Sequence, residues 1–463
     1  MLVNKRVASY LIVLALAAWV IICYNPFLLW FQNDDFVHIL LSRNGVMFQR
    51  NTFRPVCDLS VMLDYYIWKN YAPGYHLTNL ILHVICTGLV YVFCRGFFSA
   101  SPLANKRFIA FISSALFLAY PFHSEAVFWI LGRSATLGAI FSLLFLIFFL
   151  KKEKKKHDII IYIICFATAL LTYESSWVLP IVAFILMKAK GDSTKAARFH
   201  FVALCIIFLT YLLVRWLVIH QVVGGYEGVN FLQLNIGQLC LNFGRFIVRS
   251  VTNYGNSNIL LTAGFIMVPI GAVLFCLKTK QGIPREMHFM LVCFLVSLIP
   301  CLSLGIDTHG TEGERFLYLP SIFLCIGFSL IVCNVQRQPL RQLVIAAMFV
   351  LYAAQLTINA GNYRFAGNVV KQTLVQIAKT PEGKGVLVEG LPKSQHGALI
   401  LESGLQDAQL LYLPERKMNI QVLSWRYELD ELEAPYKTVV LPAAANTKFV
   451  KYVFTDSALF VYP

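Results

Sequence analysis

Long apolar stretches recur from residue 7 to about residue 360, and they restrict the folds that this chain can adopt. A helix needs roughly 20 predominantly apolar residues to cross the hydrocarbon core of a bilayer. Charged residues make up 14% of the chain, whereas soluble domains carry about 25%. The sequence therefore predicts an all-α polytopic membrane protein over residues 1–360.

Eleven transmembrane helices are predicted in this part, with boundaries set by the apolar stretches. They are placed at 7–24, 76–98, 108–120, 126–150, 158–172, 175–189, 199–219, 257–277, 288–304, 315–333 and 342–360. The first follows Lys5-Arg6, and no small-x-small cleavage pattern comes after it. We therefore interpret it as a retained helix rather than a signal peptide.

Residues 361–463 have a different composition, polar and of mixed charge, without a stretch that could span a membrane. Strand-like patterns punctuated by glycine and proline occur at 386–388, 398–401, 437–441 and 451–454. We predict two domains: a transmembrane domain at 1–360 and a small soluble α/β domain at 361–463.

The net charge of +15 is distributed in a way that argues against nucleic acid binding. The basic residues lie in alternate short loops, at Lys5/Arg6, Arg95/Lys106/Arg107, 151–156, 188–198, 278–285 and Arg337/Arg341. Such a bias marks the cytoplasmic side of a membrane protein. The N-terminus is therefore expected inside. The remaining loops, among them a long first loop at 25–75, and the C-terminal domain are expected outside.

Carboxylates gather on the outer set of loops. Of the fourteen acidic residues before residue 361, ten lie there: Asp34, Asp35, Asp58, Asp64, Glu125, Glu174, Glu227, Asp307, Glu312 and Glu314. Acidic residues contribute little to membrane orientation, so topology does not explain this clustering. It predicts a functional site at the outer face.

The twelve cysteines lie mostly inside the apolar stretches, and none follows Cys333. No CxxC spacing occurs among them. We interpret them as small, buried, apolar side chains rather than as disulfide partners or metal ligands.

Six outer segments carry polar motifs at or near helix ends. They are Asn33-Asp34-Asp35, Phe53-Arg54-Pro55, the segment from Gly74 to Asn79 with His83, the segment from Tyr120 to Val127 with Gly132-Arg133, Tyr173-Glu174, and the segment from Glu314 to Pro320. Separate segments that bring polar groups to one depth of the membrane are typical of an assembled pocket.

The order of these motifs resembles the membrane half of transmembrane O-mannosyltransferases that carry tetratricopeptide repeats. The patterns DD, FRP, GYHLxNLxLH, PxHxEAVxxxxGR and ERxLYLP follow one another within about residues 1–370. The chain is similar more broadly to GT-C glycosyltransferases, including protein O-mannosyltransferases and bacterial aminoarabinose transferases. It departs from the repeat-bearing enzymes in its last hundred residues, which show no tetratricopeptide periodicity.

This resemblance implies an inverting glycosyltransferase that uses a polyprenyl-phosphate sugar on the outer face. Inversion by direct displacement needs a carboxylate to remove the acceptor proton. By motif position, Asp34 is predicted as this base, and Asp35 as the group that orients acceptor or donor. Alternatively, the pair forms a cap or turn at the start of an interfacial helix.

A lipid phosphate that departs as an anion is stabilised by a nearby cation. The candidates are Arg54, Arg133, Arg215 and Arg315, because a guanidinium stays charged at low dielectric and binds phosphate with two N–H groups. Arg215 ranks lowest, since it lies within a predicted span. Arg315 could instead form an ion pair with the adjacent Glu314.

The other predicted substrate-binding residues are His76, Asn79, His123, Glu125, Glu174 and Glu314. A divalent cation is a possible cofactor, with Asp35 and His123 as candidate ligands, although no spacing matches a zinc signature. Hydrogen bonds to substrate or to neighbouring helices are the preferred role of the histidines. Glu174 either binds sugar hydroxyls or caps the following helix.

The acceptor is predicted to be a protein, a glycolipid or a polysaccharide, and the compact loops favour a bacterial inner membrane. Two alternatives remain: an O-antigen polymerase or ligase, and a transporter or flippase of lipid-linked sugars. A transporter is expected to have internal repeats and broken helices in matching halves, which the sequence does not show.

Overall fold

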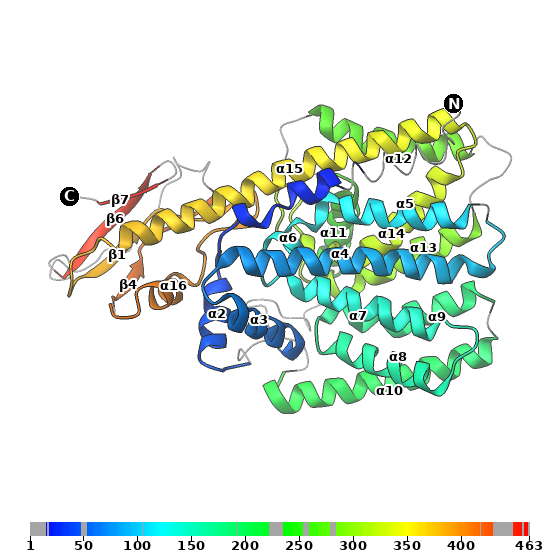
Figure 1. Cartoon of the computed structure of the whole chain (residues 1–463), viewed down its shortest axis with the longest axis horizontal. Coiled ribbons are helices and arrows are strands. Elements are labelled where there is room, and N and C mark those ends of the chain that lie inside the picture. The colour runs from blue at the N-terminus through cyan, green and yellow to red at the C-terminus, as the bar shows by residue number, and fades with distance from the viewer. Residues whose placement is uncertain are drawn as a thin grey trace.

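The computed structural model describes residues 15, 18–47, 53–103, 105–191, 193–221, 235–252, 259–277, 284–416, 418–428, 448–455 and 458–461. Most of these residues are helical, and a small strand-bearing region lies at the C-terminal end (Figure 1). The predicted span 7–24 and the predicted strand 437–441 lie mostly or wholly outside the described residues.

The α-helices are α2 (Asp35–Arg43), α3 (Pro55–Trp68), α4 (Ala72–Phe97), α5 (Lys106–Ala119), α6 (Ser124–Phe128), α7 (Arg133–Phe149), α8 (Lys156–Leu170), α9 (Leu179–Ala189), α10 (Thr194–Ile219), α11 (Ile236–Val251), α12 (Ile259–Leu277), α13 (Arg285–Ser297), α14 (Tyr318–Cys333), α15 (Gln338–Ile377) and α16 (Leu405–Tyr412). Short 3₁₀ helices include η1 (Pro26–Leu28), η3 (Pro121–His123), η4 (Glu174–Val178), η5 (Ile299–Cys301) and η6 (Glu314–Leu317).

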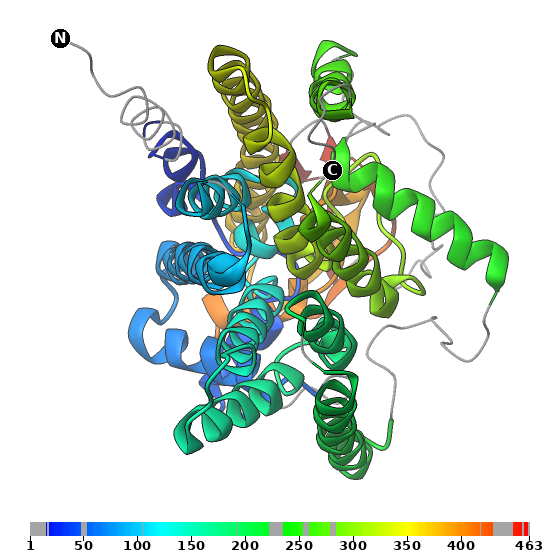
Figure 2. The ribbon, with the colours of Figure 1, turned by 90° about the vertical axis from the view of Figure 1, so that its right-hand side faces the viewer.

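Helices α4, α5, α7 and α14 form the centre of the bundle. Helix α4 packs against α5 and α7, and α14 packs against α5 and α13. Helix α8 lies on α7, and α10 lies on α9 at the periphery, as the view along the bundle shows (Figure 2). The exposed apolar side chains of α10, such as Leu209 and Leu213, suit contact with lipid.

Four helices are long and apolar enough to cross a membrane, and a fifth crossing results if one bent pair counts as a single span. The other predicted spans coincide with shorter helices, such as α5 and α13, or lie partly outside the described residues. These helices support an integral membrane protein. The number of eleven crossings stays a prediction.

The bent pair replaces the straight helix that was predicted at 126–150. The helix axis changes direction by 108° between residues Pro121–Phe128 and Arg133–Phe149. The bend depends on Gly132, since a Cβ at this position would collide with the backbone carbonyl of Glu125. The short helix α6, which carries Glu125, lies toward the end of the bundle where α2 and α3 lie (Figure 1).

The predicted border at residue 360 falls inside α15, which continues for 40 residues from Gln338 to Ile377. This single helix joins the bundle to the C-terminal region (Figure 1). The C-terminal strands are β1 (Gly385–Glu389), β2 (Leu391–Gln395), β3 (Ala398–Leu399), β4 (Ile420–Val422), β5 (Trp425–Glu428), β6 (Phe449–Thr455) and β7 (Ala458–Val461).

These strands form two small sheets. The first has the order β4-β1-β6-β7, in which β1 is parallel to both neighbours and β7 is antiparallel to β6. The second has the order β3-β2-β5. The strands predicted at 386–388 and 451–454 are confirmed, while only Ala398–Leu399 is extended in the stretch predicted at 398–401.

Candidate active site

Asp34 occupies the N-cap position of α2, but its side chain makes no capping hydrogen bond. Its carboxylate accepts a hydrogen bond from the Asn33 side-chain amide at 3.3 Å and is half-buried. Burial raises the pKa of Asp34 to about 6, and the positive charge of Arg315 opposes a larger rise. A half-buried carboxylate without a capping role is available for a proton-transfer step.

Asp35 has a different environment, although it is the adjacent residue. It is the first residue of α2 and 1% exposed, and its Oδ2 accepts a hydrogen bond from the Gln32 backbone N–H at 2.9 Å. Burial, together with the charge of Asp34, raises the pKa of Asp35 well above its usual range. The alternative turn role that the sequence offers for the pair therefore fits Asp35, whereas the Asp34 side chain makes no capping bond.

Arg315 contacts Glu125 rather than its neighbour Glu314. Its guanidinium forms an ion pair with Glu125, and its backbone N–H donates to the second oxygen of that carboxylate at 2.9 Å. The guanidinium also lies over the Trp129 ring, 5.3 Å from its centroid. Arg315 and Glu125 thus connect η6 with the bent pair. The Arg315 guanidinium also lies close enough to Asp34 to lower the pKa of that carboxyl.

Glu174 is held by two arginines. Arg54 donates to Glu174 Oε2 at 2.9 Å, and Arg215 pairs with Oε1 at 3.1 Å. The Arg54 guanidinium is partly exposed and lies 4.8 Å from the Tyr173 ring centroid, whereas Arg215 is buried. Two guanidinium groups around one carboxylate form a basic cluster at the same end of the bundle as Asp34.

Arg249 forms a buried pair with Glu314 and was not among the residues predicted from the sequence. Both side chains are 0% exposed, and the Arg249 guanidinium lies 4.7 Å from the Phe122 ring centroid. Helix α11 carries Arg249 on its buried face, together with Asn242 and Phe246. The signal that could have revealed it is an arginine that follows apolar residues at helical spacing in an outer loop.

Arg133 is surrounded by protein acceptors. It pairs with Asp64 at 2.6 Å and donates to the backbone carbonyls of Ile130 and Tyr75. Thr78 donates to the other Asp64 oxygen at 2.8 Å. These contacts join α3, α4 and α7, and they favour a structural role over the predicted phosphate contact.

Three other predicted substrate ligands also contact the protein itself. His76 lies 3.2 Å from the Trp30 carbonyl oxygen, Asn79 donates to the Trp129 carbonyl at 2.9 Å, and His123 lies 2.7 Å from the Ser321 hydroxyl. The Asn79 and His123 bonds hold the bent pair and its break against α4 and α14, whereas the His76 contact joins α4 to the segment before α2. Their predicted contact with substrate has no support in this geometry and stays a prediction.

No group of three or more His, Cys, Asp or Glu side chains is placed to hold a metal ion within the described residues. Asp35 and His123, the candidate ligands, instead contact Gln32 and Ser321. A divalent cation with Asp35 and His123 as ligands therefore stays a prediction. The cysteines that the structure describes are free, and most are buried.

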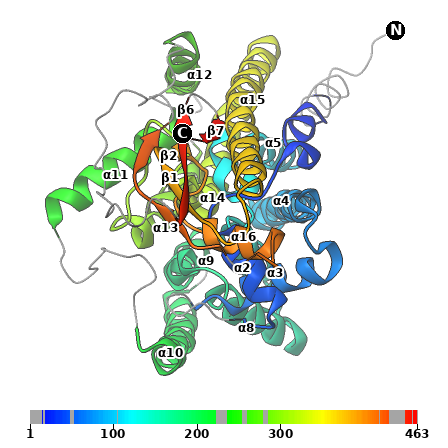
Figure 3. The ribbon, with the colours of Figure 1, turned by 90° about the vertical axis from the view of Figure 1, so that its left-hand side faces the viewer.

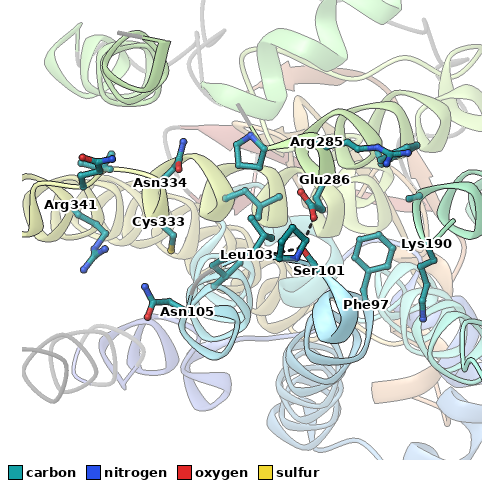
Figure 4. A pocket seen from close by; sticks show the side chains of 18 residues that line it. Phe97, Ser101, Leu103, Asn105, Lys190, Arg285, Glu286, Cys333, Asn334 and Arg341 are labelled. Atoms are coloured by element: carbon teal, nitrogen blue, oxygen red, sulfur yellow. Dashed lines mark hydrogen bonds between the residues drawn. The ribbon is translucent and has the colours of Figure 1, made fainter. Parts of the chain in front are cut away.

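A cavity in the described part of the chain lies at the other end of the bundle. It has a volume of about 950 Å³ and is lined by the ends of α4, α9 and α14 and the starts of α5, α13 and α15. Figure 4 shows the Glu286 carboxylate directed at Ser101 there. Lys190, Arg285 and Arg341 lie around it, in agreement with the predicted basic side.

No model of a known protein family matches the chain. A protein O-mannosyl-transferase of Caenorhabditis elegans, F38B6.6, is 24% identical over 331 residues, which cover 65% of this chain and 45% of the relative. The mouse protein O-mannosyl-transferase TMTC2 is 32% identical over 118 residues, 26% of this chain and 13% of the relative. The chain thus aligns with less than half the length of these relatives.

Among solved structures, ArnT from Cupriavidus metallidurans has a similar fold. The apo form aligns with a TM-score of 0.53 and 10% identity, over 95% of this chain and 92% of ArnT. The form bound to undecaprenyl phosphate gives a TM-score of 0.50 at 10% identity, over 88% and 89% of the two chains. The chain therefore has the fold of the GT-C glycosyltransferases and is a sequence relative of the protein O-mannosyl-transferases.

Proposed function

We propose that this chain is an inverting glycosyltransferase that uses Asp34 as its general base. The observation that carries the proposal is the environment of Asp34, a half-buried carboxylate without a capping bond and with its pKa raised to about 6. A base is most effective when its pKa lies near the working pH. Asp34 is thus mostly ionised at neutral pH, yet binds a proton more strongly than an ordinary aspartate.

In the proposed reaction, an acceptor hydroxyl oxygen attacks the anomeric carbon of a lipid-linked sugar. The bond from this carbon to the phosphate oxygen breaks with inversion, and the hydroxyl proton moves to an Asp34 oxygen. The leaving group departs as a polyprenyl phosphate anion. It needs no proton from a general acid, because a phosphate anion is already stable in water.

The basic cluster of Arg54, Arg215 and Glu174, together with Arg315, is the proposed binding site for the donor phosphate. Arg54 is its partly exposed member, and although its Nε and Nη2 groups contact Glu174, a planar guanidinium suits phosphate oxygens. A polyprenyl-phosphate donor is supported by the likeness in fold to ArnT, which has been solved with undecaprenyl phosphate.

A hydroxyl of a protein is the proposed acceptor, in view of the names of the sequence relatives. The site is proposed to face the outer side of the membrane, because the basic loops that the structure describes lie at the other end of the bundle (Figure 1). A bacterial inner membrane, favoured by the compact loops, also belongs to this proposal.

Donor cleavage tests the proposal directly. The purified chain in lipid nanodiscs is given a polyprenyl-phosphate sugar and a peptide that contains serine and threonine, and free polyprenyl phosphate and glycopeptide are quantified together. We expect both products in equal amounts. A transporter or flippase would leave the donor intact, and that result would overturn the proposal.

The rate of transfer is expected to depend on pH through Asp34. Only the ionised carboxylate accepts a proton, so kcat/KM should reach a plateau above about pH 6 and fall about tenfold per pH unit below it. Initial rates between pH 4.5 and 8.5 measure this limb. If kcat/KM instead fell only below about pH 4, where exposed aspartates titrate, the raised pKa of Asp34 would be contradicted.

Arg54→Lys is expected to raise the donor KM about tenfold while kcat changes little, because lysine keeps the charge but loses the planar pair of N–H groups. The matched control is Arg43→Lys at the exposed end of α2, which should leave KM unchanged. Equal effects of the two substitutions would exclude Arg54 from donor binding.

A further inference from the structure

The C-terminal region touches the candidate active site through residues 396–404, here named the clasp. The Asn33 backbone N–H donates to the Ile400 carbonyl at 2.7 Å. Ser403 returns two hydrogen bonds to Asn33 Oδ1, from its backbone N–H at 2.7 Å and from its hydroxyl at 3.2 Å. Asn33 in turn donates from its side-chain amide to Asp34. A continuous path thus leads from the clasp to the Asp34 carboxylate.

The orientation of Asn33 depends on both ends of this path. Its backbone is left-handed, with φ at 47°, a conformation that asparagine and aspartate tolerate better than most residues. Because Ser403 occupies the amide oxygen, the amide N–H₂ group is directed at Asp34. An N–H donor beside a carboxylate favours its ionised form and fixes its direction.

A second anchor joins the clasp to the loop that precedes Arg315. The Thr311 backbone N–H donates to the His396 carbonyl at 2.9 Å, and Thr311 is 1% exposed. Gly397 approaches this loop so closely that a Cβ would collide with the Thr311 backbone nitrogen. The clasp therefore contacts both chain segments that carry proposed functional groups, one beside Asp34 and one before Arg315.

The contact at Gly404 leaves no space for a side chain. A Cβ on Gly404 would collide with the Asn33 carbonyl oxygen and would lie 3.6 Å from the Asp34 Cα. The C-terminal region lies over this end of the bundle, with α16 against α2 (Figure 3). The position of the Asp34 backbone is thus coupled sterically to the C-terminal domain.

We propose that the clasp is a positioning device for the general base, in which Ser403 and Gly404 act on Asp34 through Asn33. This inference rests on the proposed function of Asp34. The C-terminal domain is accordingly part of the active site's construction rather than only a cover over it. Asn33, Ser403 and Gly404 are positioning residues, since none of them reaches the reacting atoms in the proposed reaction.

The chain offers a matched pair of glycines for the test. Gly404 and Gly383 both have φ of +79°, so alanine imposes the same backbone strain at either position. A Cβ at Gly404 would collide with the Asn33 backbone, whereas no atom lies within 4 Å of a Cβ at Gly383. Gly404→Ala is expected to lower kcat about 10- to 100-fold with little change in the donor KM, while Gly383→Ala leaves both unchanged.

A second variant tests the electrostatic step without adding bulk. Asn33→Asp keeps the oxygen that accepts from Ser403, tolerates the left-handed backbone, and replaces the N–H₂ donor with a second carboxylate oxygen. The acid limb of the pH profile is expected to move up by about one unit or more, because a like charge now faces Asp34. Asn44→Asp, at the far end of α2, is the control and should leave the limb in place.

The outcomes separate this inference from the proposed function. If Asp34→Asn retains normal transfer, the proposed function of Asp34 fails. If Asp34→Asn abolishes transfer while Gly404→Ala behaves like Gly383→Ala and Asn33→Asp leaves the pH limb unmoved, only the positioning role of the clasp is overturned. Should Gly404→Ala fail to fold, the pH limb of Asn33→Asp decides alone.

Discussion

Asp34→Asn is expected to lower kcat for sugar transfer about 10³-fold, because general base catalysis typically contributes 10²- to 10⁴-fold. The amide has nearly the shape of the carboxylate, but it does not accept the acceptor proton. Donor binding should persist, since the proposed phosphate contacts come from Arg54 and Arg315 and not from Asp34. Single-turnover transfer and equilibrium binding of a radiolabelled polyprenyl-phosphate sugar measure the two effects separately.

Asp35→Asn is the matched control, because it makes the same substitution one residue along the chain. The amide oxygen that this substitution introduces can still accept from the Gln32 N–H, and the raised pKa of Asp35 already favours its neutral form. We expect kcat to fall by less than about tenfold, the range of one neutral hydrogen bond. A larger loss at Asp35 than at Asp34 would reverse the two assignments.

The helices and their sides were predictable because they follow from composition over long segments. Most of the predicted apolar stretches are largely helical where the structure describes them, and the basic loops lie together at one end of the bundle (Figure 1). The motif order also placed Asp34, Arg54, Glu125, Glu174 and Arg315 at one end. Each of these expectations depends on residue type and spacing, which the sequence states directly.

The partners of the charged groups were not predictable, since they depend on tertiary packing. Glu314 and Arg315 are adjacent, yet each pairs elsewhere: Arg315 with Glu125, 190 residues away, and Glu314 with Arg249, 65 residues away. Adjacent side chains on a helical turn point in different directions, so they do not face each other. The ion pair between these neighbours, which the sequence left open as an alternative, thus gives way to two pairs with distant residues.

The bend at Gly132 and the clasp were also beyond the sequence analysis. The apolar stretch at 126–150 predicts one helix, because a hydropathy pattern does not show that the chain turns at Gly132 and packs there against the backbone of Glu125. The clasp lies in a segment of ordinary polar composition, and its importance comes from contact with Asn33, which is 370 residues away in the chain. A contact between residues so far apart in the chain can be identified only in the folded structure.

The buried pair of Arg249 and Glu314 is expected to have the largest effect on stability. Both side chains are 0% exposed, so removing one charge leaves the other without compensation in a region of low dielectric. Glu314→Gln should therefore lower the free energy of unfolding by about 3–5 kcal/mol. Equilibrium unfolding of the chain in mixed micelles, followed by tryptophan fluorescence, measures this loss.

The double substitution Arg249→Met with Glu314→Gln should recover much of the stability, because the uncompensated charge is removed. The matched control is the same cycle at Lys393 and Glu402, a pair with side-chain exposures of 33% and 47%. There each change should cost less than about 1 kcal/mol, since solvent screens an exposed pair. If Glu314→Gln instead left the stability unchanged and abolished transfer, Glu314 would belong to the substrate-binding groups that its sequence motif predicts.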